Sequence, residues 1–306
     1  MPLRWPLPDG SSLDLLDAGA WKRLAPELHV CEPAYLESVQ ALSCAPAELA
    51  DLGARVMKEG YFQAPPQPWG LPTHAMAACV GRLRALGIST VFAFVFDEFW
   101  VNFYKLDPLL RYLLGAEYRM LPDFWVWYVD PREDDAGWRP HRDKSHQALL
   151  PDGRPKSFTI WLPLTDADPL NSCMYVVPAD RDPTYGTERD KEWKFELSDV
   201  RALPAQAGSL LGWTQALLHW GSRGVARASG PRISMAFEFI RADVPPFNLP
   251  LIQPGTALSL AARVQLICKQ ILQYQHMYPL APRAADIAKE GTTLYDWSRS
   301  APSVIR

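Results

Sequence analysis

Residues 209–241 read SLLGWTQALLHWGSRGVARASGPRISMAFEFIR and contain two short runs with the composition of β-strands. The runs are Ser209–Trp213 and Arg232–Arg241, and glycine and proline residues punctuate the segment between them. Three similar runs come earlier in the chain: Asp123–Asp130, Ser157–Leu164 and Cys173–Val177. Short strands separated by turn residues are typical of a sandwich or small barrel rather than of a parallel sheet.

Helical patterns precede this β-rich part of the chain. Ala34–Tyr61 and Thr73–Leu86 carry apolar residues at spacings of three and four, which predicts two helices separated by the prolines of residues 64–70. Ile88–Leu114 is ambiguous. Its phenylalanines alternate over residues 92–96 as in a strand, whereas its length favours a buried helix.

After Pro254 the pattern is helical again, because six residues at helical spacing form one apolar stripe: Ala261, Val264, Ile267, Cys268, Ile271 and Tyr274. A β-core between helical flanks suits a jelly-roll, also called a double-stranded β-helix. We therefore predict a mainly β fold in a single domain. Its jelly-roll core covers residues 117–243, between helical regions at residues 1–116 and 244–306.

Composition limits the classes of partner. The chain has 306 residues, of which 48% are hydrophobic, and this is enough to bury a sizeable core. Its 31 basic and 34 acidic residues nearly cancel, so it lacks the basic surface expected of a nucleic-acid-binding protein. We expect a small-molecule partner, no nucleic acid, and a monomer or homodimer.

The cysteines and the N-terminus bear on the compartment. Five widely spaced cysteines with no C-x-x-C motif are typical of reduced thiols in an intracellular protein. The N-terminal residues lack the apolar centre of a signal peptide, and no apolar stretch is long enough to span a bilayer. We expect a cytoplasmic protein that does not enter the membrane.

A candidate metal site lies within the β-rich part. His141 and Asp143 form an H-x-D pair, and residues two apart on a strand point to the same face. His219 follows 76 residues after Asp143. Two histidines and one carboxylate make the facial triad that suits non-haem iron(II) and leaves coordination positions open. A surface hydrogen bond for the pair and a buried core position for His219 are the competing interpretations.

Arg232 and Ser234 form a second candidate group, which could bind a cosubstrate beside the triad. Arg232 stands 13 residues after His219 at the start of a predicted strand, and Ser234 shares its face. A guanidinium and a hydroxyl there could bind the distal carboxylate of a keto-diacid through charge-assisted hydrogen bonds. The keto acid end would then reach the metal. The competing interpretation for Arg232 is an ordinary salt bridge.

Residues 141–239 resemble the phytanoyl-CoA dioxygenase family of iron(II)- and 2-oxoglutarate-dependent oxygenases. The likeness lies in four segments: HRD at 141–143, WLPLTDADPLNSCMYVVP at 161–178, AGSLLGWTQALLHWGS at 207–222 and PRIS at 231–234. It implies that His141, Asp143 and His219 bind iron, that Arg232 and Ser234 anchor 2-oxoglutarate, and that Trp161 lines the cosubstrate pocket. The chain departs from the family pattern at residues 171–174 and 179–182, which leaves the substrate open.

The expected activity is oxidation of a small-molecule metabolite, with 2-oxoglutarate and O₂ converted to succinate and CO₂. Hydroxylation is the foremost expectation, and desaturation and cyclisation are alternatives. Chlorination is not expected, because related halogenases have a small residue where Asp143 stands.

On the strand before the H-x-D pair, Tyr128 or Trp127 is expected to contact cosubstrate or substrate. The connection that includes residues 187–196 is a solvated loop or a lid. Two other functions stay open: a jelly-roll binding protein without catalysis, and a zinc hydrolase using the same His/Asp/His set.

Overall fold

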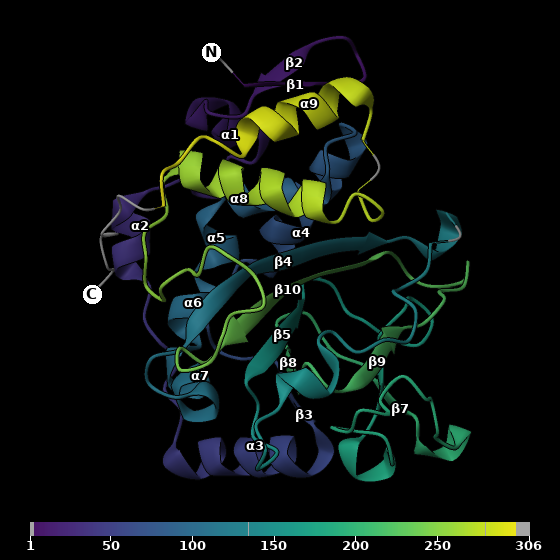
Figure 1. The fold of residues 1–306 in the computed structure, drawn as a ribbon. Coiled ribbons are helices and arrows are strands. Elements are labelled where there is room, and N and C mark those ends of the chain that lie inside the picture. The colour runs from purple at the N-terminus through teal and green to yellow at the C-terminus, as the bar shows by residue number, and fades with distance from the viewer. Residues whose placement is uncertain (1–2, 134, 279, 298–306) are drawn as a thin grey trace.

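Two antiparallel sheets form the centre of the molecule (Figure 1). The computed structural model describes residues 3–133, 135–278 and 280–297. The larger sheet has the order β3 (Tyr61–Ala64), β8 (Leu210–Thr214), β5 (Ser157–Pro163), β10 (Arg232–Ile240), β4 (Arg119–Val129). The smaller sheet has the order β7 (Arg201–Leu203), β6 (Met174–Val177), β9 (Leu218–Gly221). Every described pairing within these two sheets is antiparallel, and the predicted jelly-roll is confirmed.

The two faces of the larger sheet have different partners. Side chains alternate along β10, as they must in a strand. Phe237 and Phe239 join a core that the sheet shares with the helices, whereas Ala236 joins a second core that includes residues of the smaller sheet. Arg232 and Glu238 share the parity of Ala236 and line a cavity on this inner side. The alternation along one strand therefore separates structural residues from candidate functional ones.

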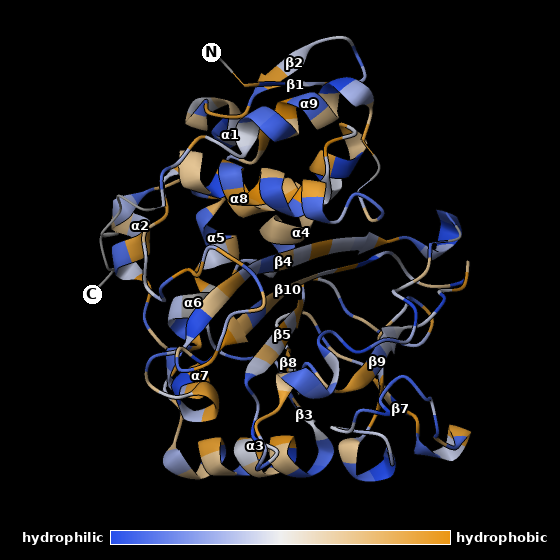
Figure 2. Ribbon diagram, in the orientation of Figure 1, coloured by the Kyte–Doolittle hydropathy of each residue, from blue (hydrophilic) through white to orange (hydrophobic). Residues whose placement is uncertain are grey.

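Helices cover the outer face of the larger sheet (Figure 1). They include α4 (Thr73–Ala85), α8 (Leu260–Gln273) and the 3₁₀ helix η1 (Thr90–Val95). Figure 2 shows hydrophobic and hydrophilic residues alternating along α8, as expected for a helix with one buried face. The stripe predicted after Pro254 is confirmed, since five of its six residues lie in α8 and Tyr274 is its C-cap.

The ambiguous region 88–114 is helical and buried, but it is divided into several short helices instead of one. After η1 it forms three short helices: α5 (Asp97–Trp100), α6 (Asn102–Lys105) and α7 (Asp107–Leu114). The alternating phenylalanines at 92, 94 and 96 are fully buried. Their alternation reflects burial on all sides rather than a strand.

The predicted helix 34–61 is divided. It consists of α2 (Pro33–Ser38) and α3 (Pro46–Glu59), and Pro46 provides a favourable first residue for the second helix. Gly60 ends α3 in the left-handed conformation with φ of 80°, and Tyr61 begins β3. The helical N-terminal region therefore contributes an edge strand to the larger sheet.

The remaining elements are short or lie near the ends of the chain. The strands β1 (Arg4–Pro6) and β2 (Ser12–Asp14) and the helices α1 (Ala18–Leu24) and α9 (Pro282–Gly291) were not predicted. Four further 3₁₀ turns occur at Pro131–Glu133, Ser145–Ala148, Ala179–Arg181 and Leu197–Asp199. None of the helices in the described part of the chain has the length and apolarity that a membrane span requires.

A buried charged cluster joins the two helical ends of the chain. The Asp97 carboxylate accepts hydrogen bonds from the backbone N–H groups of Cys31 and Glu32, at 3.0 and 2.9 Å. The same carboxylate pairs with Arg263 of α8, and both side chains are almost fully buried. Arg263 also donates to the carbonyl oxygen of Val95. The cluster thus fixes the N-terminal segment, α5 and α8 against one another.

Candidate active site

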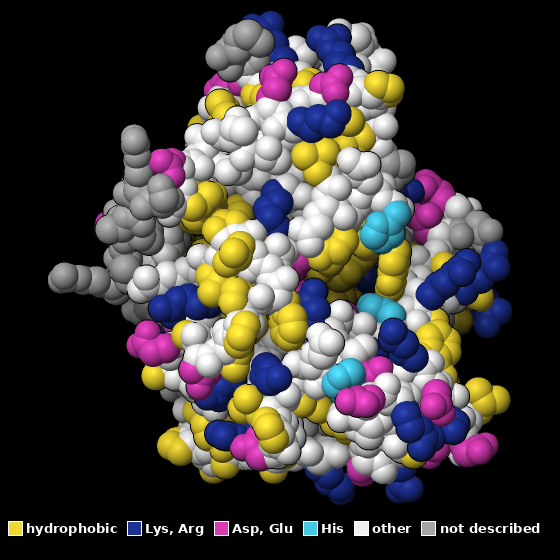
Figure 3. Space-filling model, in the orientation of Figure 1, with side chains coloured by type: hydrophobic (Ala, Val, Ile, Leu, Met, Phe, Trp, Pro, Cys, Tyr) yellow, Lys and Arg dark blue, Asp and Glu magenta, His cyan; other side chains and the backbone are white. Residues whose placement is uncertain are grey.

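A cavity of about 190 Å³ opens on the inner side of the larger sheet. Figure 3 shows this face hollowed, with hydrophobic side chains along the hollow and histidine side chains near its edges. Its aromatic walls come from the larger sheet, the loop before His141 and the segment after α8: Trp125, Trp127, Trp138, Trp161, Trp213 and Tyr274. Charged and polar residues make up half of the lining, so the cavity combines flat apolar walls with groups that can bind polar atoms.

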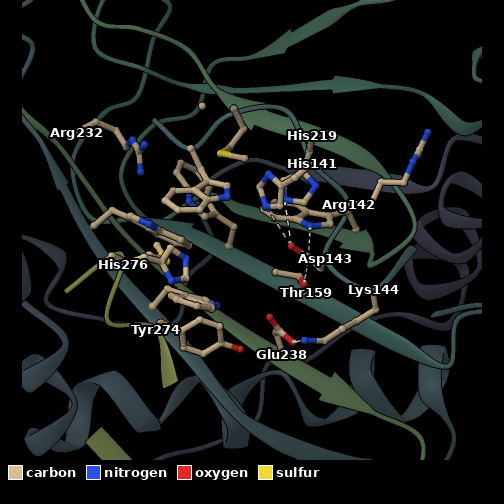
Figure 4. Close-up of a pocket in the computed structure, with 18 residues that line it drawn as sticks. His141, Arg142, Asp143, Lys144, Thr159, His219, Arg232, Glu238, Tyr274 and His276 are labelled. Carbon is tan, nitrogen blue, oxygen red and sulfur yellow. Dashed lines mark hydrogen bonds and ion pairs between the residues drawn. The ribbon is translucent and has the colours of Figure 1, made fainter. Parts of the chain in front are cut away.

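The structure brings His141, Asp143 and His219 together in this cavity (Figure 4). The Nε2 atoms of the two histidines lie 3.4 and 3.5 Å from Oδ1 of Asp143. His141 pairs with His219 through two backbone hydrogen bonds of 3.0 Å, and this bridge places the imidazole rings side by side. One ligand atom from each residue lies within 4.8 Å of the others, close enough to share one metal ion.

Backbone contacts orient both imidazole rings. Nδ1 of His141 lies 2.7 Å from the carbonyl oxygen of Arg139, and Nδ1 of His219 lies 3.0 Å from that of Leu217. A carbonyl oxygen only accepts, so Nδ1 carries the proton in both rings. Nε2 is then left with a free lone pair, which is the form that binds a metal.

Side chains orient Asp143. Its Oδ2 accepts hydrogen bonds from the Thr159 hydroxyl at 2.9 Å and from the Trp213 indole N–H at 3.2 Å. Oδ1 faces the two histidines. The carboxylate therefore has one oxygen fixed by the protein and the other directed to the position that a metal would occupy.

Electrostatics favour the ligand forms of these groups. Burial alone would raise the pKa of Asp143, but nearby His219 and His141 and the hydrogen bond from Thr159 hold it well below its usual range. Burial lowers the pKa of His219 to about 4, against the opposing effect of Asp143. At neutral pH the site thus offers an ionised carboxylate and a neutral imidazole at His219.

Arg232 enters the same cavity as a buried cation. Its side chain donates to the Ser172 carbonyl oxygen at 3.1 Å and to the Ser234 hydroxyl at 2.6 Å, and only 2% of the residue is exposed. No carboxylate of the described residues pairs with it, and burial lowers its pKa to about 10. An unpaired buried charge is costly. The site is therefore suited to an anionic ligand.

A glycine beside Arg232 allows the backbone to pack closely against its guanidinium. Gly221 ends β9 and contacts Gly137 of the loop that leads to His141. A Cβ atom at Gly221 would lie 2.7 Å from Cα of Gly137, 3.1 Å from Oγ of Ser172 and 3.3 Å from Nη2 of Arg232. A glycine is needed here so that the loop, the strand and the guanidinium can approach one another.

The other predicted cosubstrate residues have different positions. Trp161 lines the cavity with its ring 5.8 Å from the Arg232 guanidinium, and Ser234 is buried beside the same group. Tyr128 lies on the other face of β4, where Arg84 covers its ring at 4.7 Å and a separate cavity begins. Its neighbour Trp127 lines the triad cavity instead. Of the predicted set, Tyr128 alone is not brought to the triad, because adjacent strand residues face opposite ways.

The sequence profile of the phytanoyl-CoA dioxygenase (PhyH) family matches residues 39–228, more than half of the chain. The chain belongs to the phytanoyl-CoA dioxygenase family. It is accordingly a non-haem enzyme that depends on iron(II) and 2-oxoglutarate.

The chain is similar to several solved structures at low identity, and one of them, ThoJ, has the same fold. The non-haem monooxygenase ThoJ, in its apo form, aligns with a TM-score of 0.52 at 14% identity, over 79% of this chain and 99% of ThoJ. SnoN, a non-haem α-ketoglutarate-dependent epimerase from nogalamycin biosynthesis, aligns with a TM-score of 0.48 at 20% identity, over 70% of this chain and 94% of SnoN. HygX from Streptomyces hygroscopicus, with nickel and 2-oxoglutarate bound, aligns with a TM-score of 0.48 at 13% identity, over 66% of this chain and 88% of HygX. No curated protein matches the chain significantly.

The residues of this phytanoyl-CoA dioxygenase family member fit both groups on which the family depends. Two neutral imidazole nitrogens and one carboxylate oxygen are the donor set preferred by non-haem iron(II). Both rings and the carboxylate have their outer hydrogen bonds in place. The unpaired Arg232 in the same cavity provides the charge that a dicarboxylate requires.

Further cavity residues come from the same alternation and were not predicted. Glu238 lines the cavity on β10, with its Oε2 3.6 Å from Nζ of Lys144. Burial and nearby Asp123 raise the pKa of Glu238 to about 8. Thr159 lies opposite Glu238 in the sheet register. Counting every second residue back from Trp161 and forward from Arg232 would have found both positions.

The connection that was expected to be a loop or lid is anchored from the metal-site loop. Arg142, between the first two residues of the triad, donates to Asp182 at 2.6 Å and to the Asp190 carbonyl oxygen at 3.0 Å. Its side chain is only 3% exposed. His146 also contacts Asp190, through Nδ1 at 2.8 Å. Several buried contacts thus fasten this segment, and His146 is directed to it rather than to the triad.

Proposed function

We propose that this enzyme is an oxygenase that uses 2-oxoglutarate and O₂ to oxidise a small-molecule metabolite at the triad cavity. His141, Asp143 and His219 would hold iron(II). Arg232 and Ser234 would bind the distal carboxylate of 2-oxoglutarate, with Trp161 beside it. The observation that carries the proposal is the buried, unpaired Arg232 in the same cavity as a complete His/Asp/His set.

Bound iron(II) would supply the redox chemistry by which O₂ oxidises both 2-oxoglutarate, to succinate and CO₂, and the substrate. The chain's own residues position the reactants. The Arg139 and Leu217 carbonyl oxygens orient the two imidazoles, and Thr159 orients the carboxylate. The aromatic walls exclude water from the cavity and restrict the substrate to a small, partly apolar molecule.

Hydroxylation is the reaction that we assign, with desaturation and ring formation as alternatives at the same site. Asp143 supports this choice over chlorination. Its carboxylate fills the third ligand position and is fixed by Thr159 and Trp213. A halide would require that position to be vacant.

The decisive experiment concerns Arg232. Replacing one member of a buried charge pair typically costs about 2–5 kcal/mol. Because about 1.4 kcal/mol is a factor of ten, Arg232→Ala should weaken 2-oxoglutarate binding by roughly 30-fold to several thousand-fold. Arg232→Lys should recover only part of the affinity, since an ammonium lacks the planar two-point contact. The measurement is a 2-oxoglutarate titration of the anaerobic iron(II) protein, followed by the charge-transfer absorption band.

Arg241→Ala is the matched control, because Arg241 follows the end of β10 and pairs with Asp243 outside the cavity. It should bind 2-oxoglutarate as the unchanged protein does. Iron binding by Arg232→Ala should also be unchanged. An Arg232→Ala protein that is folded, holds iron and keeps full affinity for 2-oxoglutarate would contradict the assignment of Arg232.

A further inference from the structure

The end of the cavity opposite Arg232 has features of a recognition site for the primary substrate. We propose that Glu238, with Lys144 beside it, binds a hydrogen-bond-donating group, a hydroxyl or an amine, on a substrate whose remainder is a flat, largely apolar ring system. The inference rests on the proposed function, since it takes the Arg232 end to be occupied by 2-oxoglutarate.

The positions of Arg232 and Glu238 on β10 define the two ends. They are six residues apart on one strand face, which corresponds to about 20 Å at about 3.3 Å per residue. Glu238 lies opposite Thr159 in the register, and Thr159 holds Asp143. Figure 4 shows Glu238 on the Asp143 side of the triad, away from Arg232. A group bound at Glu238 therefore lies beside the metal position and clear of the cosubstrate.

Glu238 has a carboxyl oxygen on the Lys144 side that lacks a hydrogen-bond partner in the described part of the chain. The residue is only 3% exposed, and its Oε2 has no hydrogen-bond partner among the described residues. Its nearest cation is Nζ of Lys144, at 3.6 Å, which is longer than a hydrogen bond. A buried acceptor without a donor is costly. A ligand hydroxyl or amine would supply a donor to the carboxyl in either protonation state, since the protonated acid keeps an acceptor oxygen.

Of the other polar groups beside Glu238, Asp123 and Tyr274 already have partners, and Gln215, whose Oε1 has none among the described residues, does not line the cavity. Asp123, on the same face of β4, accepts 3.0 Å hydrogen bonds from Asn248 and a further one from the Tyr274 hydroxyl. Tyr274 therefore offers its ring rather than its hydroxyl to a ligand. Recognition of a donor group is left to Glu238.

Flat aromatic surfaces account for the rest of the substrate. Trp125 and Trp127 project from β4 with nearly parallel rings, at 15° to each other. Trp138, Tyr274 and His276 lie on other sides of the cavity. Such walls favour stacking with a ring system and offer few hydrogen-bonding groups to a flexible polar chain.

The test compares three naphthalene probes by isothermal titration calorimetry. They are 2-naphthol, 2-naphthylmethylamine and 2-methoxynaphthalene. All three have the same ring system, but 2-methoxynaphthalene has no hydrogen-bond donor. The protein is loaded with nickel(II) and 2-oxoglutarate, so that binding is measured without turnover. We expect at least one donor probe to bind about tenfold or more tightly than the methoxy probe. Preference for the alcohol or for the amine then identifies the donor.

Two substitutions link the preference to Glu238. Glu238→Leu should reduce it to within about twofold, and Glu238→Gln, which keeps one acceptor oxygen, should retain part of it. Glu117→Gln is the matched control, because Glu117 is exposed and precedes β4 outside the cavity. Circular dichroism and the affinity for 2-oxoglutarate verify that the variants are folded.

The outcomes separate this inference from the proposed function. Failure of the unchanged protein to bind 2-oxoglutarate would contradict the proposed function. With 2-oxoglutarate binding intact, three results would overturn the inference: equal binding of all probes, no binding of any probe, or a donor preference that survives in Glu238→Leu.

Discussion

Asp143 connects the metal position to the protein more firmly than either histidine does. Its two oxygens have different tasks, since Oδ2 binds Thr159 and Trp213 while Oδ1 faces the imidazoles. Both imidazoles depend on backbone carbonyl oxygens close to them in the chain. The carboxylate depends instead on side chains from β5 and β8, so it couples the metal position to the larger sheet.

Asp143→Ala should remove the metal site while preserving the fold. The substitution deletes the proposed anionic ligand, and water cannot replace its charge. We expect iron(II) affinity to fall by more than about 100-fold, because loss of an outer-shell partner alone costs about 10–100-fold. Anaerobic iron titration measures this, and Asp152→Ala at the surface is the control. Unchanged iron affinity and activity in Asp143→Ala would refute the assignment.

Thr159→Val tests the support of that carboxylate. Valine has nearly the shape of threonine, but it removes the hydroxyl that donates to Asp143 at 2.9 Å. Metal affinity should decrease by about 10–100-fold, the usual effect of losing an outer-shell contact. Thr159→Ser should retain most of the affinity because the hydroxyl remains. If valine and serine gave equal affinities, Thr159 would have only a packing role.

Some of these residues could be predicted from sequence and others could not. The spacing of His141, Asp143 and His219, with Arg232 on a strand, was sufficient to propose one site. Tyr128 was grouped with them because the facing of its strand was unknown, although only one of Trp127 and Tyr128 can face the cavity. Glu238 has no motif around it, and only its even spacing from Arg232 along the predicted strand could have placed it on the cavity face.

At the scale of elements, the backbones of β9 and of the loop before His141 pack closely against each other beside the site. Backbone N–H groups of Gly137 and Gly221 donate to the opposing segment at 3.0 Å, and no side chain fits between the two glycines. The loop thereby lies beside the smaller sheet as an extra strand would. The position of His141 depends on this contact.

Gly221→Ala should disturb both ligand sites together. Its Cβ atom would displace the Gly137 backbone and press on Arg232. We expect the melting temperature to fall and the affinities for iron and 2-oxoglutarate to decrease by about tenfold or more, since overpacking commonly costs about 1–3 kcal/mol. Thermal denaturation and the two titrations measure these effects.

Gly81→Ala is the control, because Gly81 lies within α4 and an added Cβ meets no atom within 4 Å. Replacing a helical glycine by alanine should stabilise the protein by about 1 kcal/mol or less. Equal behaviour of the two variants would show that the contact at Gly221 is unimportant.

Element prediction succeeded where local composition determines structure. The strands β4, β5, β6, β8 and β10 lie where β-rich runs were found, within a few residues. β3 was missed because its residues continue the apolar pattern of α3, and only the left-handed turn at Gly60 separates them. β9 was missed because it has four residues and is defined by pairing with β6. Pairing partners distant in sequence leave no local pattern.

For the whole molecule, the cluster of Asp97 and Arg263 joins segments that the sequence presents as separate flanks. A single cation compensates a carboxylate that is buried with it. Arg263→Met should therefore destabilise the protein by about 3–5 kcal/mol, because Asp97 would remain buried without its partner. Affinity for 2-oxoglutarate should not change in the folded fraction, because the cluster lies among the helices.

Urea denaturation measures this effect, and a double variant sharpens it. Asp97→Asn combined with Arg263→Met removes both charges and should recover part of the lost stability. Arg23→Met is the control, since its pairing with Asp17 is exposed. A single Arg263→Met variant as stable as the unchanged protein would show that the flanks are held by apolar packing alone.

The anchoring of residues 182–190 by Arg142 has a consequence for the route by which a substrate reaches the triad. Lifting that segment would break a buried ion pair and release contacts on both sides of the metal loop. Trp138 and His276, with ring centroids 5.8 Å apart, instead stand where the cavity meets the solvent. A substrate that entered past these two rings would leave the anchored segment and its buried ion pair in place.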